Sequence, residues 1–330
     1  MKIRNILITS AALLFSAASI SASPVTSTFA HTWVSGSGLD TNPCTFASPC
    51  ATFQGALTKT TAGGLITAKD AGDFGVLSIG QSVTIDGANL GSITYTGSSD
   101  SVISITASAS VILQNLTING LGSADYGILA ASGGTVIVDN CRIMNIAFMG
   151  IKFSGAGNLT VENSRIESFI GTNSVNGITI WADAAENVVV RNTVIDASPV
   201  SSSNQGFIVF SGTGPVKASL QNVTILGARF DAVGTGTGIT EITGSVITQS
   251  GTGVHAFTGS TISVASSMIT ANTTGVCSNA SSKIRLDNND IYDNTTAIDN
   301  CGGIVKTSGT NKTSGTIAIP PSEVSNSVTF

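Results

Sequence analysis

The chain carries little charge and few aromatic rings for its length. Of its 330 residues, 10% are charged, 5% are aromatic, seven are Pro and two are His. Helical proteins of this size usually carry far more Glu, Lys, Arg and Leu, whereas this chain is dense in Gly, Ser, Thr, Asn, Val and Ile. That composition is typical of short strands and turns, so it predicts an all-β fold.

The sequence also lacks an apolar run long enough to span a bilayer, which needs about 20 residues. Its first residues, MKIRNILITSAALLFSAASISAS, join a basic start to a short apolar run and a stretch of small residues. This order is typical of a secretory signal. We therefore predict a signal peptide at 1–22, no membrane span, and a bacterial protein that is periplasmic or secreted.

Basic residues are too few for a nucleic-acid partner. The predicted signal peptide holds two of the 14 basic residues and none of the 19 acidic ones, so the remaining chain has a formal charge of 12 − 19 = −7. Proteins that bind nucleic acid present clustered Lys and Arg to the phosphates. A nucleic-acid partner is therefore not expected.

A repeat runs through the middle and the end of the chain. In each copy an aliphatic residue stands two positions before a small polar residue, and Ile stands three after it, as in LQNLTI and VENSRI. The polar positions are Asn115, Asn140, Asn163, Asn192, Asn222, Gly244, Ser266 and Asn288, at spacings of 25, 23, 29, 30, 22, 22 and 22 residues. The Ile positions are Ile118, Ile143, Ile166, Ile195, Ile225, Ile247, Ile269 and Ile291.

Each repeat carries a second landmark, a Gly that precedes a short apolar strand in most copies. These are Gly127, Gly150, Gly177, Gly206, Gly234, Gly253 and Gly275, and Ala297 stands at this place in the last repeat. A repeat of this length with three- to five-residue strands cannot close a core alone and must stack on its neighbours. The pattern predicts a right-handed parallel β-helix, a three-sided solenoid, in which the stacked Asn residues bond main chain above and below.

The ends of the solenoid have their own patterns. CATFQGALTKT has apolar residues at helical spacing and predicts a short helix that covers the open N-terminal end. After Cys301 the repeat fades into KTSGTNKTSGT. We therefore predict one β-helix domain at 23–305, including the N-terminal cap, and a loose tail or irregular cap at 306–330.

The order of these features resembles the pectin lyase-like superfamily of right-handed parallel β-helix proteins. The segments that carry the resemblance are CATFQGALTKTTAGG, a strand pair ending in SVTIDG, and the Asn-marked coils, over roughly residues 33–305. TWVSGSGLDTNPCTFASPCATFQGAL is also similar to the start of a group of exported bacterial β-helix proteins of unsettled activity. The resemblance implies the fold, which serves lyases, hydrolases, esterases, adhesins and tailspikes alike.

No complete catalytic motif of that superfamily is present. The sequence has no Asp-Asp pair and no Gly-His-Gly of the polygalacturonase type, no Trp-Ile-Asp-His of the pectate lyase type, and no pectinesterase pattern. The prediction therefore leans towards a protein that is not an enzyme. The alternative is a polysaccharide lyase or glycoside hydrolase with a divergent site.

Two outward faces can be placed from the repeat alone. One carries Arg142, Arg165, Glu167 and Asp196, which are weak catalytic candidates for a lyase-like or acidic-sugar site. The interpretation that we favour is a solvated ladder of ion pairs that also involves Asp139, Glu162 and Arg191.

The other face carries Lys152, Trp181, Phe210 and His255, with Trp181 and Phe210 on adjacent coils. Two outward rings could pack on the apolar faces of sugars, or they could be covered by a neighbouring loop. His255 has no second His or Cys pair near it, which argues against a metal site there.

No cofactor is predicted. The run Asp287, Asp290 and Asp293 is a weak candidate for Ca²⁺, because it lacks the Gly and the terminal Glu of an EF-hand loop. The five Cys predict a disulfide between Cys44 and Cys50, a second between Cys277 and Cys301 across one coil, and a buried free thiol at Cys141.

Together these patterns predict an exported, non-catalytic β-helix protein that binds carbohydrate or a cell surface. A polysaccharide or cell-surface glycan is the expected partner.

Overall fold

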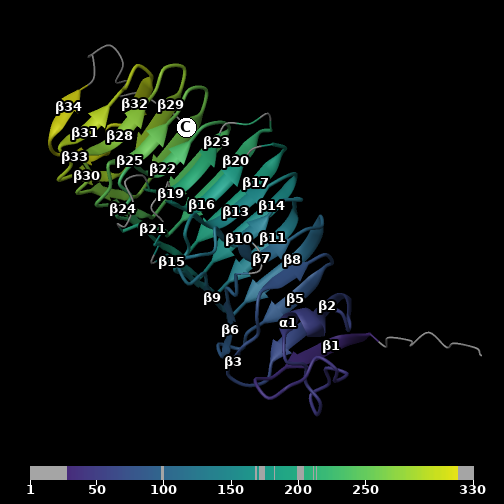
Figure 1. Cartoon of the computed structure of the whole chain (residues 1–330). Coiled ribbons are helices and arrows are strands. Elements are labelled where there is room, and N and C mark those ends of the chain that lie inside the picture. Colours follow the sequence, from purple (N-terminus) through teal and green to yellow (C-terminus); the bar gives the residue numbers. More distant parts are fainter. Residues whose placement is uncertain are drawn as a thin grey trace, which may run out of the picture.

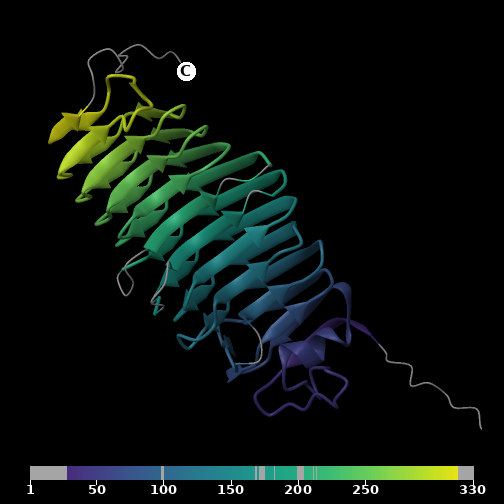
Figure 2. The ribbon, with the colours of Figure 1, turned by 45° about the horizontal axis from the view of Figure 1, so that its top comes forward.

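The computed structural model describes residues 28–97, 100–167, 169–170, 175–181, 183–198, 204–210, 212 and 214–318. The predicted signal peptide at 1–22 and the last residues, 319–330, lie outside this part. The chain winds as a right-handed, three-sided coil, and each turn adds one strand to each of three parallel sheets (Figures 1 and 2). The predicted fold class is thereby confirmed.

Sheets A, B and C form the three sides of the coil. Sheet A has 12 strands, in spatial order β1 (Phe29–Val34), β2 (Thr60–Ala68), β5 (Val83–Asp86), β8 (Ala109–Gln114), β11 (Gly134–Asp139), β14 (Gly157–Glu162), β17 (Glu186–Arg191), β20 (Val216–Gln221), β23 (Ile239–Thr243), β26 (Thr261–Ala265), β29 (Lys283–Asp287) and β32 (Ile304–Thr307). Sheet B has 11 strands, β3 (Gly72–Asp73), β6 (Gly91–Thr94), β9 (Thr117–Asn119), β12 (Arg142–Met144), β15 (Arg165–Glu167), β18 (Val194–Asp196), β21 (Thr224–Leu226), β24 (Val246–Thr248), β27 (Met268–Thr270), β30 (Asp290–Tyr292) and β33 (Lys312–Thr313). Sheet C also has 11, β4 (Leu77–Ile79), β7 (Ser101–Ile105), β10 (Tyr126–Ala130), β13 (Met149–Ser154), β16 (Val175–Trp181), β19 (Asn204–Phe210), β22 (Asp231–Thr235), β25 (Thr252–Ala256), β28 (Thr274–Ser278), β31 (Thr296–Asp299) and β34 (Thr316–Ala318).

The core is a set of columns of like residues. The eight repeat Ile residues are register partners from β9 to β30, and all are buried. The landmark glycines stack where sheet C begins: a Cβ on Gly177 would lie 2.6 Å from the carbonyl oxygen of Gly206 and 2.4 Å from Cγ2 of Ile195. The coils therefore approach too closely at Gly177 for a side chain there.

One coil departs from the predicted glycine column. Gly234 is the register partner of Ile208, whereas the position stacked on Gly206 is Ala232. Gly234 thus belongs to an outward column, next to His255.

The repeat Asn residues act differently from the prediction. Asn115, Asn140, Asn163, Asn192 and Asn222 have φ between 48° and 58°, the left-handed region that Asn tolerates well. Their side chains bond other side chains, as when Asn222 donates to Asn192 at 2.9 Å. Asn recurs here because the bend needs this backbone conformation, and the side-chain ladder adds to it.

The hydrogen bonds between side chain and main chain are made by the residue that follows each repeat Asn position, on the inside of the same bend. The backbone N–H of Val223 donates to Ser245 Oγ at 3.1 Å, that of Ser245 to Ser267 Oγ at 3.1 Å, and that of Ser267 to Asn289 Oδ1 at 3.0 Å. These small polar residues satisfy buried N–H groups that the bend leaves without a strand partner.

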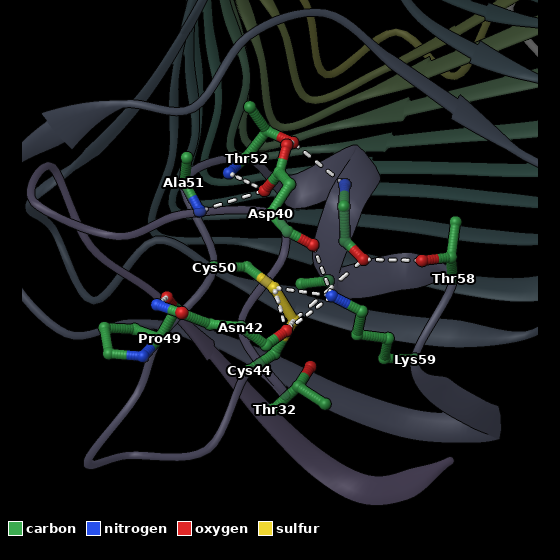
Figure 3. Close-up of a disulfide and its surroundings, with 12 residues drawn as sticks. Thr32, Asp40, Asn42, Cys44, Pro49, Cys50, Ala51, Thr52, Thr58 and Lys59 are labelled. Carbon is green, nitrogen blue, oxygen red and sulfur yellow. Dashed lines mark hydrogen bonds between the residues drawn. A yellow bond between two sulfur atoms is a disulfide. The ribbon is translucent and has the colours of Figure 1, made fainter. Parts of the chain in front are cut away.

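The N-terminal end of the coil is closed by α1 (Phe53–Leu57) (Figure 2). Thr52 caps the helix by accepting the N–H of Gly55, and its own hydroxyl donates to Asp40 Oδ2 at 2.8 Å. Beside it, Lys59 donates to the carbonyl oxygens of Asp40 and Asn42, next to a disulfide (Figure 3). The predicted capping helix is confirmed.

The coil continues beyond the predicted boundary at residue 305. Strands β33 and β34 pair with β30 and β31 as further sheet members. Thr313 takes the column position of Ile291, and Asn311 Oδ1 accepts the N–H of Asn289 at 2.9 Å. The periodicity was hidden because polar residues replace the Ile landmark at this exposed end.

Both predicted disulfides are present, Cys44 to Cys50 and Cys277 to Cys301, with Cα–Cα distances of 4.6 and 5.6 Å. Cys141 is buried and free. In the part of the chain that the structure describes, no helix has the length and apolarity needed to cross a membrane.

Candidate functional site

The charged face lies on sheet B, where Glu167 is held between two arginines. Arg142 Nη2 lies 2.6 Å from Glu167 Oε1, and Arg165 Nε donates to Glu167 Oε2. Arg165 also reaches Asp196 at 3.4 Å. Burial disfavours the ionised Glu167 carboxyl, but the arginine bonds outweigh it and lower its pKa. The four predicted residues therefore form one ion-paired cluster.

The remaining residues of the predicted ladder lie on sheet A. Arg191 Nε donates to Glu162 Oε2 at 2.5 Å, whereas Asp139 accepts from the amide of Asn163 at 2.8 Å. The ladder is thus two separate groups on two sides of the coil.

The aromatic face lies on sheet C. Trp181 and Phe210 are register partners at the ends of β16 and β19, and their ring centroids are 5.1 Å apart at an interplanar angle of 40°. Lys152 Nζ lies 4.9 Å from the centroid of the Trp181 ring and 5.5 Å from that of Tyr126. Trp181 is 37% exposed, so among the described residues no loop covers it completely.

A pocket of about 310 Å³ opens beside this pair. It is lined by Phe148, Met149, Asn176, Trp181, Gln205, Phe210 and Phe230. Four aromatic rings therefore border one hollow that also holds two amide side chains. Apolar walls with a few placed polar groups are typical of small-ligand sites.

The two amides belong to a polar row at the start of the sheet C strands. Asn176 pairs in register with Gln205. Gln205 Nε2 donates to Asp231 Oδ2 at 3.1 Å, from one coil to the next. Asn176 donates to Thr179 Oγ1 at 3.3 Å, while its Oδ1 has no hydrogen-bond partner in the described structure.

His255 lies at the far end of this row rather than in the pocket. Its Nδ1 is 2.9 Å from Asp231 Oδ1 and its Nε2 is 3.1 Å from Asn279 Oδ1. Its ring packs against that of Phe257 with centroids 4.1 Å apart and an interplanar angle of 40°. Burial opposes the charged imidazole, but the bond and the charge of Asp231 outweigh it, so the pKa of His255 is raised.

The predicted acidic run does not converge on one point. Asp287 accepts from Ser308 and Thr310, and Asp290 lies 3.3 Å from Lys312. Asp293 lies in a bend and has a φ of 57°. Within the described residues no group of three or more His, Cys, Asp or Glu side chains could hold a metal.

One buried acid escaped the sequence analysis. Glu186, at the start of β17, is 1% exposed, and neither carboxyl oxygen has a hydrogen-bond partner in the described structure. Burial, and secondarily the charge of Asp183, raise its pKa to about 8. Glu186 is therefore a neutral acid in the wall of the coil at neutral pH.

Comparisons with known proteins agree with this architecture. The family described as a right handed beta helix region matches residues 66–225. The crystal structure of pectate lyase Pel9A superimposes with a TM-score of 0.60 at 13% identity, over 91% of this chain and 79% of that chain. This chain is therefore a right-handed parallel β-helix protein, and it shares this fold with pectate lyase Pel9A.

Two other solved structures share this fold. The A-module of the Azotobacter vinelandii mannuronan C-5 epimerase AlgE4 has a TM-score of 0.57 at 14% identity, over 77% of this chain and 80% of that chain. A rhamnogalacturonan lyase has a TM-score of 0.52 at 10% identity, over 90% and 86%. No curated protein sequence matches. Likeness at these identities is a likeness of fold.

The two rings were predicted from the sequence, but Asn176, Gln205 and Asp231 were not. Asn176 and Gln205 directly precede landmark glycines, so the register could have placed them in one row. Asp231 directly precedes Ala232, and because that coil has Ala rather than Gly at the landmark position, the sequence gives no signal for it there.

Proposed function

We propose that this protein is exported and binds polysaccharide, without acting on it, through the outer face of sheet C at Trp181 and Phe210. The observation that carries the proposal is the pair of neighbouring rings, partly exposed, at the rim of a pocket that also holds amide groups. Sugar rings pack their apolar faces on aromatic side chains and bond through their hydroxyl groups. Both kinds of contact are available here.

Two further observations support the proposal. Pel9A is a pectate lyase and AlgE4 is a mannuronan C-5 epimerase, so proteins with this fold act on polysaccharides. The two disulfides fit an oxidising compartment outside the cytoplasm.

The test is retention of the purified protein on immobilised polysaccharides. We expect retention that Trp181→Ala lowers at least tenfold, because removal of the ring deletes the main stacking surface. Phe46→Ala is the matched control, since Phe46 is also an exposed ring but lies in the N-terminal cap region. Equal retention of wild type and Trp181→Ala would refute the proposal.

A second candidate is a polysaccharide lyase or hydrolase whose divergent site is the charged cluster on sheet B. A pocket of about 300 Å³ there is lined by Arg142, Arg165 and the stacked asparagines Asn115, Asn140 and Asn163. The two arginines favour this pocket as a place for an acidic sugar. Against it, both arginines are already paired with Glu167. Formation of unsaturated or reducing ends that Arg165→Ala abolishes would support this candidate.

A further inference from the structure

The pocket beside Trp181 holds polar groups of one chemical kind. Asn176 and Gln205 contribute side-chain amides from neighbouring strands, about 4.8 Å apart in the sheet. No Lys, Arg, Asp or Glu of the described residues lines the pocket. Amides donate and accept hydrogen bonds with little preference for charge, so this lining suits hydroxyl groups.

Asn176 lies in the wall of the pocket and has one unmet hydrogen-bond acceptor. The residue is 2% exposed, and its Oδ1 has no partner within the described structure. A buried polar atom without a partner is unfavourable. A ligand hydroxyl that reached this oxygen after a small movement of the pocket wall would satisfy it, so the atom favours a ligand that donates a hydrogen bond.

Gln205 is oriented by the carboxylate behind it. Asp231 is 6% exposed, and one of its oxygens accepts Gln205 Nε2 while the other lies against His255. Because a carboxylate only accepts, the Gln205 amide must present its nitrogen to Asp231, which leaves Oε1 for a further donor. Asp231 is thus a positioning residue.

The charges near the pocket disfavour an anionic ligand. Asp231 stands directly behind Gln205. The nearby cation, Lys152, is engaged with the ring faces of Trp181 and Tyr126 and does not line the pocket. A carboxylate in the pocket would face two amide oxygens and the field of Asp231.

The two ends of the pocket also require a ligand longer than one sugar ring. Asn176 and Trp181 are five residues apart on β16, about 16 Å at the rise of a strand, yet both line the same pocket. A ligand that bonds the amides and stacks on the rings must extend along the strands.

We infer that the site selects an uncharged oligosaccharide, whose hydroxyl groups bond Asn176 and Gln205 while its ring faces pack on Trp181 and Phe210. This specificity rests on the proposed function, because it concerns the same face. It separates the chain from its structural neighbours titled pectate lyase and mannuronan epimerase, whose names refer to acidic polymers.

The experiment compares retention of the purified protein on uncharged polymers, galactomannan and a mixed-linkage β-glucan, with retention on polygalacturonate and alginate, each at 50 and 500 mM salt. We expect retention on an uncharged polymer, unchanged by salt, and at least tenfold weaker retention on both acidic polymers. Asn176→Leu and Gln205→Leu should each lower retention about tenfold. The matched control is Gln221→Leu, which removes an exposed amide on sheet A.

The outcomes separate this inference from the proposed function. Salt-sensitive retention on acidic polymers only, lost in Trp181→Ala, would overturn the inference and leave the binding face intact. Retention on uncharged polymers that both amide variants preserve would overturn the assignment of the pocket. Retention on none of the polymers would count against both. Thermal unfolding of each variant shows whether it is folded. If a variant is not folded, the retention of the wild type on uncharged against acidic polymers still tests the inference.

Discussion

Asp231 and His255 join two neighbouring coils on the outer face of sheet C, with Oδ1 of the first 2.9 Å from Nδ1 of the second. Burial disfavours the charged imidazole, but this contact raises the pKa of His255 above its ordinary value of 6.5. The other histidine, His31, has its pKa lowered by burial. The two histidines should therefore titrate on opposite sides of pH 6.5.

This pair gives the first prediction. A pH titration by NMR should show one imidazole above and one below 6.5, and Asp231→Asn should move only the upper one down. Because the folded pKa of His255 is raised, its charge stabilises the fold fully below pH 6.5, and that contribution is lost as the pH rises through the folded pKa. An upper titration that does not move in Asp231→Asn would contradict the assignment.

Glu186 gives a second pH dependence. Its carboxyl ionises near 4.5 in the unfolded chain but at about 8 in the folded one, so the folded state holds an extra proton between these values. The free energy of unfolding should therefore fall as the pH rises from about 5 to about 8, with a slope of at most roughly 1.4 kcal/mol per pH unit.

The measurement is urea unfolding across this range for the wild type and Glu186→Gln. The variant keeps the shape of the neutral acid and should lose the decline. Parallel stability curves for the two proteins would show that Glu186 is not the titrating group.

Gly177 should not tolerate a methyl group. In Gly177→Ala the added Cβ would meet the carbonyl oxygen of Gly206 and the side chain of Ile195, so we expect a loss of about 1–3 kcal/mol in the free energy of unfolding. Gly80→Ala is the control, because a Cβ there meets nothing closer than 3.8 Å. Equal stability of the two variants would refute this account of coil spacing.

Cys141 should be chemically silent in the folded protein. Burial, opposed by backbone hydrogen bonds, raises the pKa of its thiol to about 12. Without reductant we expect no reaction with a thiol reagent at pH 8 in the native state and one thiol per chain after unfolding in urea. A rapid native reaction that Cys141→Ala abolishes would show that this column opens readily.

More of the fold than of the site could be predicted from the sequence, and particular residues show why. The Ile column repeats because each coil must present the same shape to the next, and shape repeats are visible in sequence. The end of the coil escaped detection because the polar residue Thr313 occupies the column position of Ile291, and no strand among residues 28–318 packs beyond it.

The site depends on features that do not repeat. Trp181 and Phe210 could be paired from their distance to the landmark glycines, but the pocket also needs Phe148 and Phe230, which lie outside the strands, in the connections before β13 and β22. Asn176 and Gln205 share a register position, yet only their environment shows one amide bonded to a carboxylate and the other with a free oxygen. Glu186 could not be predicted as a buried acid, because nothing in its local sequence distinguishes it from a surface one.

The central claim is that ligand contacts Trp181, and fluorescence tests it most directly. The chain has two tryptophans, so Trp33→Phe leaves Trp181 as the sole indole and keeps a ring stacked on His31. We would titrate this variant with a polysaccharide that retains the wild-type protein. The account predicts a saturable change in Trp181 emission at the concentrations that give retention. Retention with unchanged emission would contradict it and would place the binding surface elsewhere on the coil.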